Sequence, residues 1–243
     1  MADLSKDEEP DEACVDISST YQKYHWDCGI ACAQMVLSFV LPSTPASEED
    51  FDEIRRKLMV GHSVWTIDLA HIMQHLGVKH QFFTVTLGVD PTYSAVDFYT
   101  KRKEAERFTE EEERINDLFS KASEKGINVE KRSVTKEELI QHLSRQNVAI
   151  VLVDSSLLRC VNCDRKHEVE CDCCIWNRMP TRERQYQGHF IVLCGYNKSK
   201  RRFLFKNPTF HADLCAACYC SFDNFDEARK SHGTDEDVLL VFR

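Results

Sequence analysis

An apolar run that starts directly after Asp27 places the strongest limit on how this chain folds. From Cys28 to Val40 nearly every position is small or apolar, and neither glycine nor proline interrupts the run after Gly29. This pattern predicts a helix that is buried on most of its surface. Asp27 is well placed as the N-cap residue of that helix. The sequence therefore puts Cys28 at the start of a buried helix.

The position of Cys28 suits a nucleophile. A thiol reacts as the thiolate, and a helix N-terminus and a nearby imidazolium both stabilise that anion. Gly29 allows a substrate backbone to approach closely. Gln22, six residues upstream of Cys28, is able to point its amide at the same place as the Cys28 N–H, and together these donors would form an oxyanion hole. The alternative is that Cys28 is a buried helix residue without a chemical role.

His189 is the best candidate among the ten histidines for a base beside Cys28. It begins an apolar predicted strand, where its other interpretation is a half-exposed residue at a strand end. Asn207 follows the next predicted strand, and its amide would orient the imidazole. If His189 faces Asn207, the hairpin has the three-residue loop 197–199, which is a common length. In that register both side chains share one face of the sheet.

The other elements predict a mixed α+β fold. Helices come first and antiparallel strands come late, which differs from the βαβ order of parallel sheets. Residues 1–18 are acidic and are expected to be a disordered tail, and residues 19–243 are expected to form a single domain with a cysteine-rich insertion at about 158–185. The charged helix over 97–125 is expected to be a solvated surface arm. The predicted helices are 28–40, 47–59, 64–76, 97–125, 135–146 and 222–231, and the predicted strands are 78–87, 148–153, 189–196, 202–206 and 238–242.

Eight of the twelve cysteines fall in two clusters, 160–174 and 215–220. Each cluster contains a Cys-x-x-Cys pair of the spacing that binds zinc. The clusters flank the predicted hairpin at the end that carries His189 and Asn207, so they should border the Cys28 site. The other hypothesis is a set of free surface thiols that are prone to oxidation. The predicted zinc ligands are Cys160, Cys163, Cys215 and Cys218, with Cys171, Cys173, Cys174 and His167 as the alternative donors.

Gln22, the motif Asp27-Cys28-Gly29 and the stretch Gly188-His189-Phe-Ile-Val192 resemble the motifs of the C39-like peptidases, which belong to the papain-like superfamily. This resemblance implies a papain-like cysteine proteinase fold with N-terminal helices packed on a mainly antiparallel sheet. It also implies that Cys28, His189, Asn207 and Gln22 are the catalytic residues. The third catalytic residue of C39 enzymes is usually Asp, so Asn207 follows the pattern of papain-type enzymes instead.

A second resemblance covers residues 18–242. Stretches 63–70, 148–153, 186–192 and 233–238 are similar to the plant-type guanylyl cyclase family, whose animal members are guanylyl cyclase domain-containing proteins. That resemblance implies conversion of GTP to cyclic GMP with Mg²⁺ or Mn²⁺. The sequence shows no glycine-rich phosphate loop, and no pair of carboxylates stands out at strand ends to hold the metal ions.

These residues predict a cysteine hydrolase that acts on a peptide or isopeptide bond through a thioester and needs no cofactor. The alternatives are a guanylyl cyclase and a catalytically silent papain-fold module that binds protein partners. The net charge of −9 argues against binding to nucleic acid or an anionic membrane. The sequence contains neither a signal peptide nor an apolar run long enough to span a bilayer. We therefore expect a protein or peptide substrate and a cytoplasmic or nuclear location.

Overall fold

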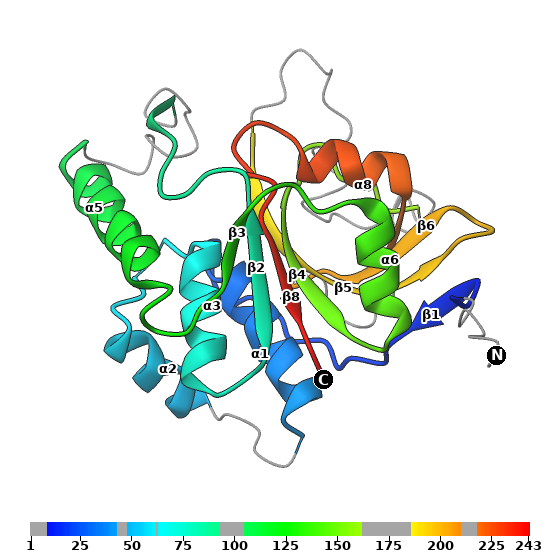
Figure 1. The fold of residues 1–243 in the computed structure, drawn as a ribbon, viewed down its shortest axis with the longest axis horizontal. Helices are drawn as coiled ribbons and strands as arrows, with labels where there is room; N and C mark the ends of the chain where they lie inside the picture. Colours follow the sequence, from blue (N-terminus) through cyan, green and yellow to red (C-terminus); the bar gives the residue numbers. More distant parts are fainter. Residues whose placement is uncertain (1–8, 43–47, 62, 93–104, 162–185, 210–217) are drawn as a thin grey trace, which may run out of the picture.

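Strand β4 (Val148–Asp154) lies at the centre of the sheet around which the chain folds (Figure 1). The computed structural model describes residues 9–42, 48–61, 63–92, 105–161, 186–209 and 218–243. β4 is apolar up to its last residue because both of its faces are covered. It pairs antiparallel with β8 (Val238–Val241) on one side and with β5 (Gly188–Asn197) on the other.

The sheet has eight strands in the order β3-β2-β8-β4-β5-β6-β7, and β1 pairs with β5 outside this path. β2 and β3 pair in parallel, and the other described pairings are antiparallel. The prediction of a mixed α+β fold with a mainly antiparallel sheet is therefore confirmed. The outer strands are β1 (Glu12–Cys14), β2 (His80–Thr84), β3 (Val129–Lys131), β6 (Arg202–Lys206) and β7 (Cys218–Ser221).

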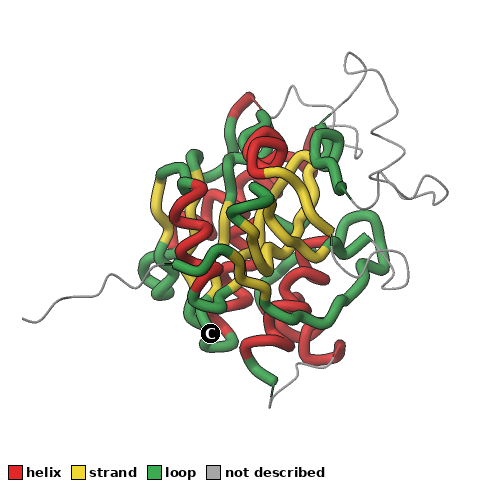
Figure 2. The backbone as a smooth tube through the Cα atoms, turned by 90° about the vertical axis from the view of Figure 1, so that its right-hand side faces the viewer, coloured by secondary structure: helices red, strands yellow, loops and turns green. Residues whose placement is uncertain are grey.

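Helices cover both faces of the sheet, as Figure 2 shows with the strands in the middle of the molecule. The sheet divides the apolar core in two, because alternate side chains of each strand point to opposite faces. The first layer contains α1 (Cys28–Val40), α2 (Glu48–Lys57), α3 (Thr66–His75) and α5 (Ala105–Lys121), and the second contains α6 (Lys136–Ser144) and α8 (Phe222–Arg229).

The segment expected to be a disordered tail contains β1, so that expectation is wrong for residues 12–14. Ala13, Val15 and Ile17 are buried and Glu12, Cys14 and Asp16 are exposed, which is the alternation of an extended segment. The sequence analysis missed this alternation because it judged the segment by its acidic composition alone.

The charged helix α5 is held against the body of the protein by a few residues on one of its faces. Ile115 is fully buried. Arg114 forms hydrogen bonds with the buried carboxylate of Asp68 on α3, with atom separations of 2.6 and 3.0 Å. A few apolar residues and one ion pair therefore fix a helix whose sequence is mostly polar.

None of the helices in the described part of the chain combines the length and the apolar character needed to span a membrane.

Candidate functional site

Helix α1 begins at Cys28, as predicted, and the Cys28 side chain is buried. Asp27 occupies the N-cap position, but its carboxylate does not cap the helix. The carboxylate accepts hydrogen bonds from the backbone N–H groups of Lys23 at 3.0 Å and Tyr24 at 2.9 Å. Asp27 thus shapes the loop before α1.

The thiol of Cys28 is acidified by its neighbours. Burial raises its pKa, but the hydrogen bond and charge of His189, together with the backbone N–H groups of Phe190 and Gly29, outweigh burial and lower the pKa below its usual value. A thiolate beside an imidazolium is the reactive form of cysteine. The structure therefore brings together the predicted nucleophile and the predicted base.

His189 is oriented by Asn207. The Nε2 atom of His189 lies 2.9 Å from Oδ1 of Asn207. The same Oδ1 accepts the backbone N–H of Thr209 at 3.0 Å, which identifies this atom as the amide oxygen. Because an amide oxygen only accepts, Nε2 carries the proton and Nδ1 is left to interact with Cys28.

Gln22 lies next to this cluster, but its donor is already engaged. Nε2 of Gln22 donates to the carbonyl oxygen of Tyr24 at 2.9 Å, and Oε1 accepts from the hydroxyl of Thr209 at 3.5 Å. The backbone N–H of Gln22 donates to the carbonyl of Pro208 at 3.0 Å. In this arrangement Gln22 fixes the segment that carries Asn207 and Thr209, and its role as an oxyanion donor stays a prediction.

The predicted hairpin register is wrong. Asn197 pairs with Arg202, so the loop is 198–201 and not 197–199. A bulge at Cys194 then shifts the register by one residue, and Leu193 pairs with Phe205. Extending this register sets His189 opposite Thr209, two positions from Asn207 and on the same face. Asn207 therefore reaches the imidazole diagonally and not from the directly opposite position.

Gly29 has a packing role that differs from the predicted one. A Cβ atom at this position would lie 3.0 Å from Cδ2 of Phe190 and 3.0 Å from Cγ1 of Val64. Gly29 is therefore packed against protein side chains and is not open to a substrate backbone. Because Val64 precedes α3 by two residues, the N-termini of α1 and α3 lie side by side.

The described members of the two cysteine clusters meet in the core beside β7. The N–H of Val161 donates to the carbonyl of Tyr219 at 2.8 Å, which brings Cys160 to this strand. Cys160, Cys218 and Cys220 are all buried, so the hypothesis of surface thiols is wrong for these three. The zinc site stays a prediction, because several of its donors lie outside the described residues, namely Cys163, His167, Cys171, Cys173, Cys174 and Cys215.

A second polar site, which the sequence analysis missed, lies at the start of β8. Asp235 and Asp237 line a small cavity together with Thr66 at the start of α3 and Thr84 at the end of β2. These residues are far apart in the sequence, and two acids among the chain's 40 acidic residues carry no distinctive spacing. A pair of carboxylates at a strand end is thus present, contrary to the prediction.

The two sites occupy the same edge of the sheet. The N–H of Leu152 on β4 donates to the carbonyl of Asp237 at 3.1 Å, and Leu152 pairs with Phe190, the neighbour of His189. Asp237 and Phe190 are therefore separated by two strand spacings of about 4.8 Å each. The acid pair and the Cys28 cluster therefore border one region, beside the N-termini of α1 and α3.

Comparison with known proteins corrects the predicted reaction. The sequence matches the guanylylate cyclase family over residues 17–241, a range that includes both sites. It is also 32% identical, over 236 residues, to Guanylyl cyclase 1 of Arabidopsis thaliana, and the alignment covers 96% of this chain and 77% of that protein. The prediction of a cysteine hydrolase of the thiol protease type is therefore wrong, and the cyclase alternative is favoured. By the extent of both matches, the chain belongs to the guanylylate cyclase family.

Proposed function

We propose that this chain is a guanylyl cyclase that converts GTP to cyclic GMP and pyrophosphate. The observation that carries the proposal is the family match over residues 17–241, which spans the Cys28 cluster, the acid pair and the strands between them. The name of the Arabidopsis relative points to the same reaction.

The shared edge of the sheet offers features that suit a nucleoside triphosphate. The N-termini of α1 and α3 lie side by side there, and a helix N-terminus favours anions through its dipole and its unpaired N–H groups. This local preference supports binding of phosphate groups by a chain whose net charge is −9. Asp235 and Asp237 would hold a divalent cation, which when bound offsets the negative charge of the triphosphate.

Cyclisation also requires a group that accepts a proton. The 3′ oxygen of the ribose forms a bond to the α-phosphorus, the bond from that phosphorus to the oxygen bridging to the β-phosphate breaks, and pyrophosphate leaves. The proton of the 3′ hydroxyl must pass to a base. In this proposal the base is the Cys28–His189 pair, whose thiolate is able to take up one proton. Asn207 keeps the imidazole in the tautomer that serves Cys28.

The test is to incubate the purified chain with GTP and Mg²⁺ or Mn²⁺ and to identify the products by chromatography with mass spectrometry. We expect cyclic GMP and pyrophosphate in equal amounts and loss of this turnover in His189→Ala and Cys28→Ser. Cys14→Ser is the matched control, because Cys14 is an exposed cysteine on β1. Release of GDP and phosphate without cyclic GMP, or no turnover in the wild type, would contradict the proposal.

The finer fold prediction, a papain-like architecture of the C39 type, also stays a proposal. It is supported by a cysteine at the start of a buried helix beside a histidine on an antiparallel strand. This proposal concerns the architecture alone and implies no hydrolysis.

A further inference from the structure

Asp237 is a buried carboxyl group with an unmatched oxygen atom. Asp237 directly precedes β8, and 6% of the residue is exposed. Its Oδ1 atom has no hydrogen-bond partner in the part of the chain that the structure describes. A buried carboxylate without a counter-charge is unfavourable. Asp237 therefore needs either a proton or a cation.

Thr66 contributes a second unmatched oxygen to the same cavity. It is the first residue of α3, 1% of it is exposed, and its Oγ1 has no hydrogen-bond partner among the described residues. Its hydroxyl lies near the carboxyl group of Asp237, yet Oγ1 of Thr66 and Oδ1 of Asp237 each lack a partner within hydrogen-bond distance. Buried polar atoms in folded proteins are nearly always paired. Two unmet oxygens on one cavity indicate a ligand that both would contact.

The size of the cavity fits a single ion. Its volume is about 10 Å³, which is close to the space that one water molecule requires. The polar groups around it are oxygens of carboxylates and hydroxyls, and the wall contains neither histidine nor cysteine. The polar side chains of the wall are Thr66, Thr84, Thr86, Asp235 and Asp237, together with the indole of Trp65.

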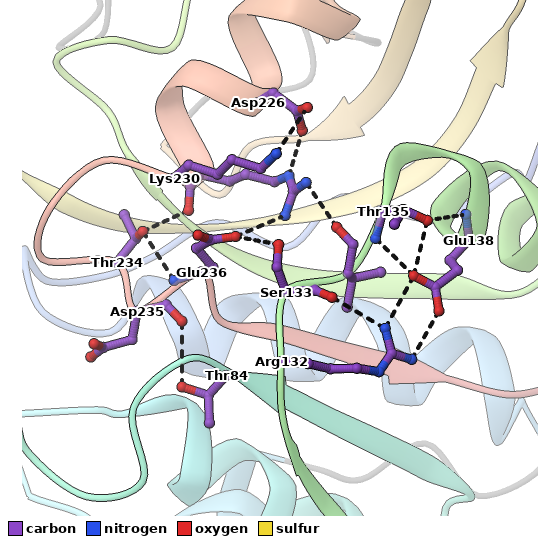
Figure 3. Close-up of polar contacts among 12 residues, drawn as sticks. Thr84, Arg132, Ser133, Thr135, Glu138, Asp226, Lys230, Thr234, Asp235 and Glu236 are labelled. Carbon is purple, nitrogen blue, oxygen red and sulfur yellow. Dashed lines mark hydrogen bonds and ion pairs between the residues drawn. The ribbon is translucent and has the colours of Figure 1, made fainter.

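The loop before β8 is held in place from several sides, as Figure 3 shows for residues 234–236. The hydroxyl of Thr234 donates to the carbonyls of Arg229 at 2.6 Å and Ser231 at 2.9 Å. The backbone carbonyl of Asp235 accepts the N–H of Val85 at 2.9 Å. These bonds fix the backbone of residues 234–236 beside the cavity.

We propose that Asp235, Asp237 and the Thr66 hydroxyl form a binding site for a hard divalent cation, of the class of Mg²⁺, Mn²⁺ and Ca²⁺. Oxygen ligands of this kind suit these ions, and Mg²⁺ commonly takes one or two carboxylates and completes its shell with water and phosphate oxygens. Among the described residues no group of three or more His, Cys, Asp or Glu side chains is placed to hold a metal ion, so this site supplies two carboxylates and one hydroxyl at most. The site therefore leaves coordination positions for water or a bound phosphate.

This inference rests on the proposed function for the role of the cation, but not for its binding. The start of α3 favours anions, so the carboxylates hold the cation and the helix end is left to the anionic ligand that the cation bridges. In the cyclase that ligand would be the triphosphate of GTP.

The test is a Tb³⁺ titration of the full chain without nucleotide, with excitation of tryptophan. Trp65 lines the cavity, so Tb³⁺ bound there should show sensitised luminescence that saturates, and Mg²⁺, Mn²⁺ or Ca²⁺ should displace it. We expect Asp237→Asn to weaken the affinity at least tenfold. Trp65→Phe should abolish the sensitised signal while thermal stabilisation by Mg²⁺ is retained.

Asp223→Asn is the matched control, since the Asp223 side chain is 83% exposed on α8, and its affinity should equal that of the wild type. If Asp237→Asn proves unfolded by circular dichroism, Asp235→Asn takes its place. The site would be overturned if Asp237→Asn and Asp235→Asn bound Tb³⁺ with the affinity of the wild type. It would also be overturned if Asp223→Asn lost affinity as well. Binding without production of cyclic GMP would instead contradict the cyclase and leave the cation site standing.

Discussion

His189 donates from Nε2 to Oδ1 of Asn207 because β5 contains one extra residue, Cys194. In the register between the hairpin loop and Cys194, positions 189 and 207 would fall on opposite faces of the sheet. The bulge at Cys194 shifts the pairing by one residue and returns both positions to the same face. The orientation of the imidazole thus depends on a backbone irregularity five positions along the same strand.

Replacing Asn207 tests whether this bond acidifies Cys28. In Asn207→Ala the imidazole loses its acceptor, and we expect the pKa of Cys28 to rise by about one unit, which corresponds to about 1.4 kcal/mol. This is the usual net contribution of a single hydrogen bond. The measurement is the rate of Cys28 alkylation as a function of pH. Asn207→Asp is the control, because it retains an acceptor and should keep the pKa low; an unchanged profile in Asn207→Ala would contradict the argument.

The pH dependence of the wild type follows from the same cluster. Because His189 lowers the pKa of Cys28, its alkylation by iodoacetamide should reach half of its maximal rate below about pH 8.5, the ordinary cysteine value. In His189→Ala burial is opposed only by the backbone N–H groups of Phe190 and Gly29, so the midpoint should move upward. Peptide mapping by mass spectrometry measures each cysteine separately.

Cys194 serves as the internal control in that experiment, because burial raises its pKa to about 12. It should stay unmodified over the pH range in which Cys28 reacts. If Cys28 reacts no faster than Cys194 near neutral pH, the thiolate interpretation is wrong.

Two glycines offer a matched test of the contact between α1 and α3. In Gly29→Ala the new Cβ would press on Phe190 and Val64 at 3.0 Å, and such overpacking typically costs about 1–3 kcal/mol. Gly61→Ala is the control, because no atom lies within 4 Å of its Cβ position. Urea unfolding gives both free energies. Equal values would mean that the N-termini of α1 and α3 are not tightly packed.

Local sequence patterns predicted the elements that bury a regular apolar stripe. The helix from Cys28 to Val40 and the strand from Arg202 to Lys206 have the predicted bounds. The short strand β3 was missed because three residues are too few to show a period of two. The hairpin register was wrong because it set His189 directly opposite Asn207, whereas the two side chains meet diagonally. The bulge was missed as well, because it leaves no mark on the apolar sequence of a strand that is buried on both faces.

The candidate site also has one part that local sequence patterns predicted and one part that they did not. Cys28 and His189 each follow a local signal, a helix start and a strand start, and the structure brings them together. The cavity of Asp237 and Thr66 depends on contacts between residues about 170 positions apart in the chain, and such contacts leave no local signal. Knowledge of the tertiary structure was needed to find it.

The ion pair between Arg114 and Asp68 gives the last prediction. The Asp68 side chain is 1% exposed and the Arg114 side chain 16% exposed, so Arg114→Ala would leave a buried carboxylate unpaired and should cost about 3–5 kcal/mol. Lys121→Ala, on the same helix but with its side chain 51% exposed, should cost less than about 0.5 kcal/mol.

The cost of Arg114→Ala should also depend on pH. Burial raises the pKa of Asp68 and Arg114 counteracts this effect, so the pKa of Asp68 should rise further in the variant. A carboxyl whose folded pKa is raised destabilises the protein above its unfolded pKa and has no effect below it. The loss in Arg114→Ala should therefore be largest at neutral pH and shrink toward pH values of about 4, as urea unfolding over a pH series would measure. A loss that is independent of pH, or no larger than that of Lys121→Ala, would show that Arg114 does not neutralise Asp68.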